Sequence, residues 1–376
     1  MESPDFIITY DGFGVSELFF CPGEVDLARW FCPGGGPGSV FVTDQSVAAL
    51  PALGSFCGRF GGTVRRGVGI AGNDLLVVLP PGEAHKTIDS VTAILRAALE
   101  HDLPRRTRFC GIGGGVVCDM TAFAASVYKR GGGALELVPT TLLAMADAAV
   151  GGKAGCDLGP YKNMVGSFYP ARRIRFFPAF LRTLPEAEYR SGLAEILKTA
   201  LLFDSALFED FKHRRASLLH PAEGDFEGTI LPIVQRCVEA KARVVERDLR
   251  ETGERMLLNY GHTFAHALET VAGLGTVPHG DAVAWGMARA VTLSARLGLC
   301  TDSYCGEVCA LLTDYGWETG PVPAGRHGFT AEALLGAMKK DKKNSDAGTV
   351  RVILQRSLCD TVIREVADDD IRGVLK

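Results

Sequence analysis

The chain has 376 residues, which is too many for one domain of ordinary size, so we expect one large domain or two ordinary ones. Its apolar fraction of 47% and charged fraction of 22% are typical of a folded globular protein. The formal net charge of -4 gives no electrostatic reason to expect nucleic acid or an anionic membrane as a partner, and no apolar run reaches the roughly 18 residues of a transmembrane helix.

Eleven cysteines are scattered along the chain, and none of them forms a C-x-x-C pair. Cys305 and Cys309 would lie one helical turn apart, but no second pair is near them in the sequence. The odd number and irregular spacing favour reduced thiols over disulfides or a thiolate metal site. The acidic start of the chain lacks the charged and apolar regions of a signal peptide. We therefore expect a cytoplasmic protein.

In the first half of the chain, short β-rich runs alternate with helical stretches such as residues 90–101. This alternation is typical of a mostly parallel sheet that is covered by helices. We therefore predict an α/β domain over residues 1–180. Its predicted strands are residues 39–43, 75–79, 108–112 and 135–138.

Beyond about residue 180 the pattern changes to helical periodicity, and strand-like runs almost vanish apart from residues 350–354. We therefore predict a second, mostly α-helical domain over residues 181–376. Its predicted helices are residues 190–211, 229–247, 263–272, 281–297 and 331–340.

Three consecutive glycines, Gly113 to Gly115, stand where a predicted strand ends and a helix should begin. Glycine lets the backbone approach a phosphate closely, and a helix N-terminus offers free N–H groups. A tight turn without a ligand would use the same residues. Asp44 and the pair Thr140 and Thr141 end two other strands, and ligands of parallel sheets bind at such strand ends. The spacing does not fit G-x-G-x-x-G, so a dinucleotide site here would depart from the standard Rossmann fingerprint.

A second glycine-containing segment, residues 147–153, combines an aspartate with a lysine and is followed by Lys162 and Asn163. Lysines beside glycines often hold phosphate, but surface loops carry lysines by default. The spacing alone leaves both interpretations open.

Three of the eight histidines lie between residues 262 and 279. His262 and His266 are four residues apart and would face the same way on a helix. His279 lies at the start of another predicted helix, and Glu195 lies in an apolar helical stretch where an unpaired charge would be costly. Imidazoles with a carboxylate suit zinc or a similar divalent metal. The spacing favours His262 and His266 as the ligand pair, and capping or core histidines are the alternative.

Taken together, these motifs resemble the 3-dehydroquinate synthase family of sugar-phosphate cyclases. Any one of them could arise by chance, but all of them in this order hardly could. The motifs cover most of the chain and comprise Gly82, Glu83 and Lys86, residues 113–119, 139–144 and 147–153, Lys162 to Met164, residues 190–195 with Lys198, residues 259–266, His279 with Gly280, and residues 341–343.

The resemblance implies an N-terminal Rossmann-like NAD-binding domain, a helical metal-binding domain and an active site in the cleft between them. It implies NAD and one divalent metal, zinc or cobalt, as cofactors, a sugar phosphate as substrate and a homodimer as the assembly. It also changes the ligand set, because Glu195, His262 and His279 hold the metal in this family while His266 faces the substrate phosphate.

The resemblance further implies roles for polar residues around the ligand set. Around NAD it places Asp44, Glu83, Lys86, Gly114, Gly115, Asp119, Thr140, Thr141, Lys153 and Lys162. On the substrate phosphate it places Lys153, Asn163, Asn259, His266 and Lys342, together with Arg130 lent across the dimer interface. On the substrate carboxylate it places Lys241 and Arg255, and on the hydroxyls near the metal Asp147, Lys198 and Glu251.

The activity implied by the resemblance converts 3-deoxy-D-arabino-heptulosonate 7-phosphate to 3-dehydroquinate and phosphate, a lyase step of the shikimate pathway. NAD oxidises a secondary alcohol transiently, phosphate leaves, the hydride returns and an intramolecular aldol step closes the ring. Three positions depart from the family pattern, and none removes a catalytic group. They are Cys118, Ala265 and the residues that follow Lys198.

Three other functions are alternatives. Another cyclase is the nearest, above all an amino-dehydroquinate synthase, because inosose and valiolone makers tend to differ at the position of Asn259 and near Lys342. A metal-dependent polyol dehydrogenase usually has an aspartate where this chain has Glu195, and it lacks the phosphate-binding lysines. A regulator that only binds metal or nucleotide would not need the basic residues.

Overall fold

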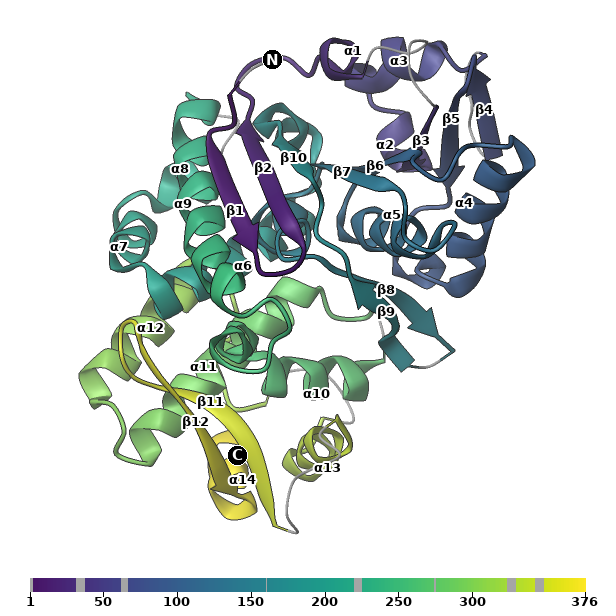
Figure 1. Ribbon diagram of the computed structural model, residues 1–376. Coiled ribbons are helices and arrows are strands. Elements are labelled where there is room, and N and C mark those ends of the chain that lie inside the picture. Colours follow the sequence, from purple (N-terminus) through teal and green to yellow (C-terminus); the bar gives the residue numbers. More distant parts are fainter. Residues whose placement is uncertain are drawn as a thin grey trace. The chain divides into compact units, whose positions relative to one another are not determined.

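The computed structural model describes residues 3–31, 38–61, 67–159, 161–219, 225–273, 275–322, 329–341 and 348–376. Its contacts divide the chain into two compact units (Figure 1). Unit 1 comprises Met1–Leu184 with Ile230–Arg250, and unit 2 comprises Pro185–Thr229 with Glu251–Lys376. The expected division at residue 180 differs in one segment, because most of helix α9 (Phe226–Arg247) belongs with unit 1.

Unit 1 is built on an eight-stranded sheet with the strand order β1-β2-β10-β7-β6-β3-β5-β4. The central strands, from β2 to β5 in this order, run parallel, and β1 and β4 pair antiparallel at the two edges. The four predicted strands are confirmed as β3, β5, β6 and β7, whereas the other four were not predicted. The strands are β1 (Phe6–Tyr10), β2 (Gly14–Phe20), β3 (Ser39–Asp44), β4 (Gly67–Ala71), β5 (Asp74–Leu79), β6 (Arg108–Gly113), β7 (Ala134–Pro139) and β10 (Arg173–Phe176).

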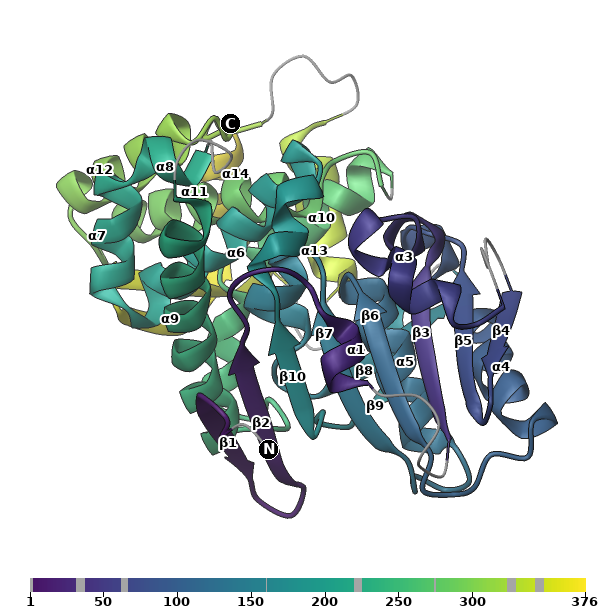
Figure 2. The ribbon, with the colours of Figure 1, turned by 90° about the horizontal axis from the view of Figure 1, so that it is seen from above.

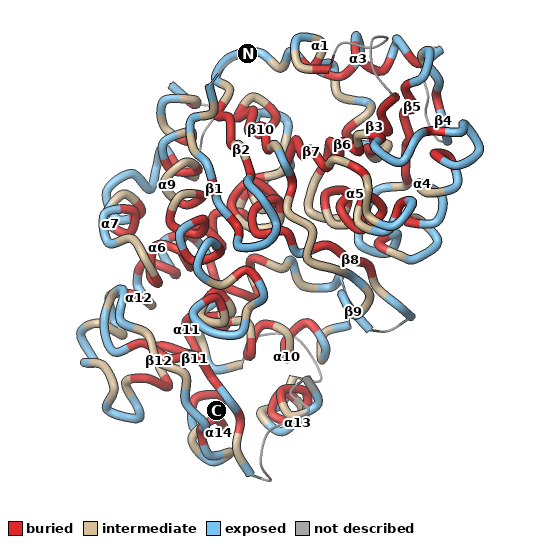
Figure 3. Tube along the Cα trace, viewed as in Figure 1, coloured by how far each residue is buried: buried red, intermediate tan, exposed pale blue. Residues whose placement is uncertain are grey.

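Helices cover both faces of this sheet, as the views in Figures 1 and 2 show. On one face, Phe41 of β3 packs against the rings of Phe31, which directly follows α1 (Leu27–Trp30), and Phe56 of α3 (Pro51–Gly58). The alternating side chains of β3 point to the other face, where α4 (Ile88–Glu100) and α5 (Gly115–Val127) connect parallel strands of the sheet. Figure 3 shows strands β3, β5, β6 and β7 buried along almost their whole length, which explains their nearly continuous apolar sequences.

Three further elements of unit 1 carry residues of interest. They are the short α2 (Gln45–Ala48) after β3, the π-helix η2 (Ala144–Ala148), and a hairpin of β8 (Lys153–Leu158) and β9 (Tyr161–Phe168). The hairpin packs on α5. Its glycine- and lysine-containing sequence does not alternate in polarity, so it was not predicted as strand.

Unit 2 is mostly helical, as predicted. The predicted helix over residues 190–211 is interrupted at Asp204, whose carboxylate accepts a hydrogen bond from the Leu207 backbone at 2.9 Å and caps a new helix. The elements are α6 (Glu186–Phe203), α7 (Ser205–His213), α8 (Arg215–Leu219), α10 (His262–Ala272), α11 (His279–Arg296), α12 (Asp302–Asp314), α13 (Ala331–Asp341), β11 (Thr349–Ser357), β12 (Asp360–Ala367) and α14 (Asp368–Leu375). No helix among the described residues has the length and apolar character needed to cross a bilayer.

Helix α11 lies at the centre of unit 2 and packs against both α6 and α10. The two contacts are unusually close because glycine lies at each. A Cβ added to Gly280 would collide with the backbone of Ser191 on α6, and one added to Gly286 would collide with the carbonyl oxygen of Gly261, which precedes α10. These contacts fix how the three helices cross.

The close contact at Gly286 makes a prediction about stability. We expect Gly286→Ala to lower the free energy of unfolding by about 1–3 kcal/mol, because the added methyl group must push α10 away from α11. Gly306→Ala on α12 is the matched control, since nothing lies within 4 Å of its added Cβ and alanine favours a helix by about 0.5–1 kcal/mol. Urea unfolding measures both, and equal effects of the two variants would contradict the account.

Candidate metal and dinucleotide sites

Three side chains that can ligate a metal come together in unit 2, and the helix crossings place them there. Glu195 lies one turn after Ser191 on α6, and His279 directly precedes Gly280 at the start of α11. His262 directly follows Gly261, whose positive φ of 81° begins α10. Each ligand candidate is therefore next to, or one turn from, a close backbone contact.

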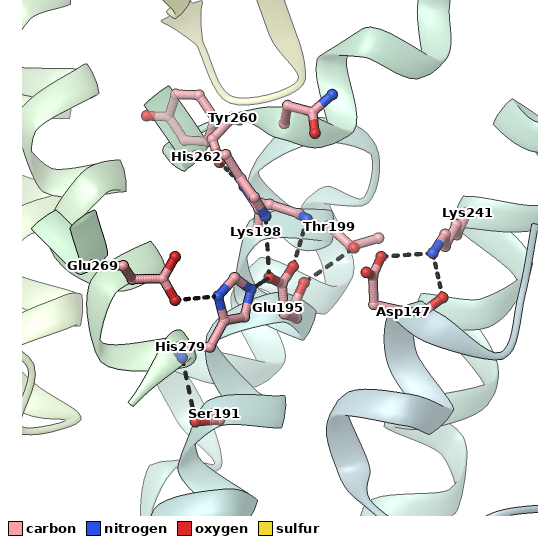
Figure 4. Close-up of polar contacts among 12 residues, drawn as sticks. Asp147, Ser191, Glu195, Lys198, Thr199, Lys241, Tyr260, His262, Glu269 and His279 are labelled. Atoms are coloured by element: carbon pink, nitrogen blue, oxygen red, sulfur yellow. Dashed lines mark hydrogen bonds and ion pairs between the residues drawn. The ribbon is translucent and has the colours of Figure 1, made fainter. Parts of the chain in front are cut away.

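The ligand atoms of Glu195, His262 and His279 all lie within 4.8 Å of one another (Figure 4). The Oε1 atom of Glu195 is 3.3 Å from Nε2 of His279 and 3.6 Å from Nε2 of His262. Ligands at about 2.1 Å from a tetrahedral zinc ion are roughly 3.4 Å apart, so these separations fit a shared divalent cation. The donor set of one carboxylate and two imidazoles also suits it.

Hydrogen bonds aim both imidazoles at this point. Nδ1 of His262 lies 3.2 Å from the Tyr260 carbonyl oxygen, and Nδ1 of His279 lies 3.2 Å from Oε1 of Glu269. When Nδ1 donates to these oxygens, the Nε2 lone pair is directed at Glu195. Glu269 was missed in the sequence, although it is seven residues after His262 and so lies on the same helix face.

The electrostatics of this group centre on Glu195, which is only 1% exposed. The Lys198 ammonium forms an ion pair with its Oε2 atom. Burial, helped by the Lys198 charge, lowers the pKa of His262 to about 3, so that imidazole is neutral. Burial also acts to lower the pKa of His279, but hydrogen bonds to Glu195 and Glu269 outweigh it and raise the value to about 10. A divalent cation would compete with that proton for the same lone pair.

The other predicted residues of unit 2 lie on the same elements. His266 is one turn after His262, with ring centroids 5.4 Å apart, and lies outside the group of ligand atoms. Asn259 ends η4 (Glu254–Asn259) and donates to the carboxylate of Glu251, whose φ of 57° is unusual for a residue other than glycine. Arg255 on η4 is 1% exposed.

In unit 1, the carboxyl ends of three parallel strands meet at one edge of the sheet. Gly113 ends β6 beside Pro139 of β7, and Gly114 is the N-cap of α5. A Cβ on Gly114 would lie 3.1 Å from the Thr141 side chain, so any larger residue would have to displace that side chain by a few tenths of an ångström. The Thr140 hydroxyl is buried and has no hydrogen-bond partner among the described residues. This edge offers backbone N–H groups and a free hydroxyl to an anionic ligand.

Asp44 ends the neighbouring strand β3, as predicted, and its side chain also caps the helix that follows. Its Oδ1 atom accepts a hydrogen bond from the Val47 backbone at 2.9 Å and caps α2. Burial raises its pKa, although these backbone hydrogen bonds act in the opposite direction.

Lys86, Asp119 and Asn163 form a connected group on three different elements. The Nζ atom of Lys86 lies 2.7 Å from the Asp119 carboxylate on α5 and donates to Oδ1 of Asn163 on β9 at 2.6 Å. Lys86 is 5% exposed, and burial acts to lower its pKa, but the charges of Asp119 and Glu83 raise it. The ammonium is therefore held beside the start of α5, where an anion would bind.

Asp147 lies in the π-helix η2, a distortion that is frequent at functional sites. Its carboxylate is 2.6 Å from the ammonium of Lys241 on α9, and Lys241 also donates to the Asp147 carbonyl oxygen (Figure 4). Lys241 and Arg255 are both expected to bind the substrate carboxylate. The contact between Lys241 and Asp147 does not test this expectation, because Arg255 belongs to unit 2.

The remaining predicted residues are on loops and edges of unit 1, with one exception. Arg130 is exposed in the turn after α5 with a φ of 69°, and Lys153 is exposed at the start of β8. Glu83 begins the short η1 (Glu83–His85), and Lys162 is half-buried on β9. Lys342 lies outside the described residues.

None of the ten cysteines in the described part of the chain takes part in a disulfide.

Comparison with known proteins matches the two parts of this chain to one family. The sequence profile described as 3-dehydroquinate synthase N-terminal matches residues 76–191, and the one described as 3-dehydroquinate synthase C-terminal matches residues 192–344. The 3-dehydroquinate synthase of Pelobacter propionicus is 39% identical over 301 residues, which are 80% of this chain and 81% of that protein. That of Rippkaea orientalis is 37% identical over 299 residues, which are 79% and 80%.

A solved structure shares the whole fold. It is the 2-epi-5-epi-valiolone synthase from Streptomyces hygroscopicus subsp. jinggangensis, with a TM-score of 0.80, 26% identity and coverage of 100% of this chain and 98% of that one. The fold class predicted from the sequence is thus confirmed. The chain belongs to the 3-dehydroquinate synthase family of enzymes.

Proposed function

We propose that this chain acts as a 3-dehydroquinate synthase, converting 3-deoxy-D-arabino-heptulosonate 7-phosphate to 3-dehydroquinate and phosphate without net redox change. One observation carries the proposal above the others. It is the group of Glu195, His262 and His279, built around a buried carboxylate, in a chain that is 39% identical to a 3-dehydroquinate synthase over 80% of its length.

NAD and one divalent metal, zinc or cobalt, are the proposed cofactors. The related valiolone synthase structure contains NAD+ and Zn2+. Held by Glu195, His262 and His279, such a cation would polarise a substrate hydroxyl, and NAD would accept a hydride from that carbon and return it. The neutral state of His262 and the burial of Glu195 support this ligand set.

The other residues of unit 2 are proposed to bind substrate. The buried ammonium of Lys198 lies beside Glu195 and would hold a substrate oxygen next to the metal ligands. Arg255 would pair with the substrate carboxylate, because a planar guanidinium donates two parallel hydrogen bonds. His266 and the Asn259–Glu251 pair would contact the phosphate and its neighbouring hydroxyls, where charge develops as phosphate leaves.

The strand-end edge of unit 1 is proposed to bind NAD. The backbone N–H groups at Gly114 and Gly115 would receive the pyrophosphate at the N-terminus of α5. The buried Thr140 hydroxyl supports a polar ligand there. Asp44 would accept hydrogen bonds from a ribose. The remaining proposed NAD contacts are Glu83, Lys86, Asp119, Thr141, Lys153 and Lys162.

Five polar or charged side chains of unit 1 are proposed to act on substrate. Lys153 and Asn163 on the β8–β9 hairpin would bind the phosphate, with Lys342 completing the set. Lys241 is held by Asp147, so this pair would present one ammonium and one carboxylate to the substrate. Arg130 is exposed and would serve the partner subunit of a homodimer. We place the enzyme in the cytoplasm and in the shikimate pathway.

An assay of substrate, phosphate and NADH tests this function. Metal-loaded protein with NAD should release one phosphate for each 3-dehydroquinate formed from 3-deoxy-D-arabino-heptulosonate 7-phosphate, with no accumulation of NADH absorbance. Protein stripped of metal is the control, and adding zinc or cobalt should restore its rate. Accumulating NADH would point to a polyol dehydrogenase, and the absence of turnover would point to another cyclase, such as an amino-dehydroquinate synthase.

Two histidine variants test the ligand set. We expect His262→Ala to lower metal affinity by more than about 100-fold, because it removes a ligand rather than an outer partner. His266→Ala should keep the metal and lose about 100-fold or more in kcat, because it removes a polar group from the phosphate site. Metal titration followed by steady-state kinetics measures both. Equal loss of metal in the two variants would contradict this ligand set and would support His262 and His266 as the ligand pair.

A further inference from the structure

Two thiol groups, those of Cys305 and Cys309, form a polar pair on α12 that the proposed function does not use. Both residues are half-buried and one helical turn apart. The Sγ atom of Cys305 lies 4.0 Å from the Thr292 hydroxyl on α11, and Cys309 follows one turn later on the same face of α12. The pair therefore faces the neighbouring helix.

A buried cation lies on the same part of α11. Arg289 is 4% exposed and three residues before Thr292, and its guanidinium donates to the Val374 carbonyl oxygen at 2.9 Å and to that of Thr319. Its charge stabilises thiolate on both cysteines. Interaction between the two thiols lowers the pKa of Cys305 and raises that of Cys309. Loss of one proton from the pair is therefore favoured at Cys305.

The spacing of the pair decides what it can do. Side chains four residues apart on a helix have Cβ atoms about 5–6 Å apart, whereas a disulfide requires about 3.5–4.5 Å. Disulfide formation would therefore have to distort α12. Two thiolates that bind one metal ion at about 2.3 Å each can be up to about 4.6 Å apart, which the undistorted helix allows.

We propose that Cys305 and Cys309 form a binding site for a soft, thiophilic metal cation, with Cu(I) as the preferred occupant. Thiolate ligands select Cu(I) over harder ions. Cu(I) would bond to the Cys305 thiolate and to the Cys309 sulfur, which releases its proton. The product has two S–Cu bonds and a net charge of minus one, and the Arg289 guanidinium offsets that charge. This site is independent of the proposed catalytic metal, which harder nitrogen and oxygen ligands would hold.

A competition with a chromophoric chelator tests the site. Reduced protein that already carries its divalent metal is titrated anaerobically with Cu(I) in the presence of bicinchoninate. The wild type should withdraw one equivalent of Cu(I). Cys305→Ser and Cys309→Ser should each lower the affinity at least about 100-fold, because a single thiolate loses the chelate effect. Cys300→Ser is the matched control, since Cys300 is also half-buried near the start of α12 but outside the pair, and it should keep the wild-type affinity.

A second measurement keeps the proposal testable if a serine variant folds poorly. Wild-type protein is alkylated with N-ethylmaleimide with and without one equivalent of Cu(I), and the modified cysteines are identified by mass spectrometry. Cu(I) should protect Cys305 and Cys309 and leave the alkylation of Cys300 and Cys359 unchanged. Unchanged affinity in both serine variants, or protection confined to other cysteines, would overturn the proposal.

Discussion

The close packing of α11 against α6 and α10 is the constraint on which the candidate metal site depends. Gly280 and Gly286 leave no room for a side chain at the two crossings, so the backbones touch. Three ligand candidates from segments far apart in the sequence are placed beside these contacts, and none of them needs to reach far. A crossing that was wider by one methyl group would separate their atoms. Gly280 and Gly286 are therefore as important to the geometry of the site as the ligand candidates themselves.

Within that frame, the buried carboxylate of Glu195 sets the electrostatics. A carboxylate with 1% exposure would be expensive without positive charge nearby, and Lys198 and His279 supply some of it. Glu269 in turn holds His279, so two acidic residues are linked through one imidazole. A hydrophobic cluster of the same volume would be as stable or more so. The polar arrangement therefore makes more sense as a binding site than as a device for stability.

Hydrophobic period and turn residues were enough to predict strands β3, β5, β6 and β7, the glycine turn and most helices, because each of these signals depends on a single element. They did not predict strands β2 and β10, the lysine-containing hairpin or the edge strands, whose burial depends on the elements beside them. The candidate ligands show the same limit. The i, i+4 spacing selected His262 with His266 because it depends on one helix only, whereas the crossing of α10 and α11 brings His279, together with His262, to Glu195. Likewise, periodicity shows that residues 230–250 have an apolar face but not which unit covers it.

The central claim is that Glu195 is buried in order to bind a cation, and metal-linked stability tests it most directly. Urea unfolding of the wild type and of Glu195→Gln is compared with and without free zinc at about 100 times the wild-type Kd. For each protein, the free energy of unfolding with zinc is compared with the value without zinc. This difference does not depend on how much stability the variant loses with the ion pair to Lys198. The wild type should gain about 2.7 kcal/mol from zinc and the variant close to none. An equal gain in both proteins would contradict the account.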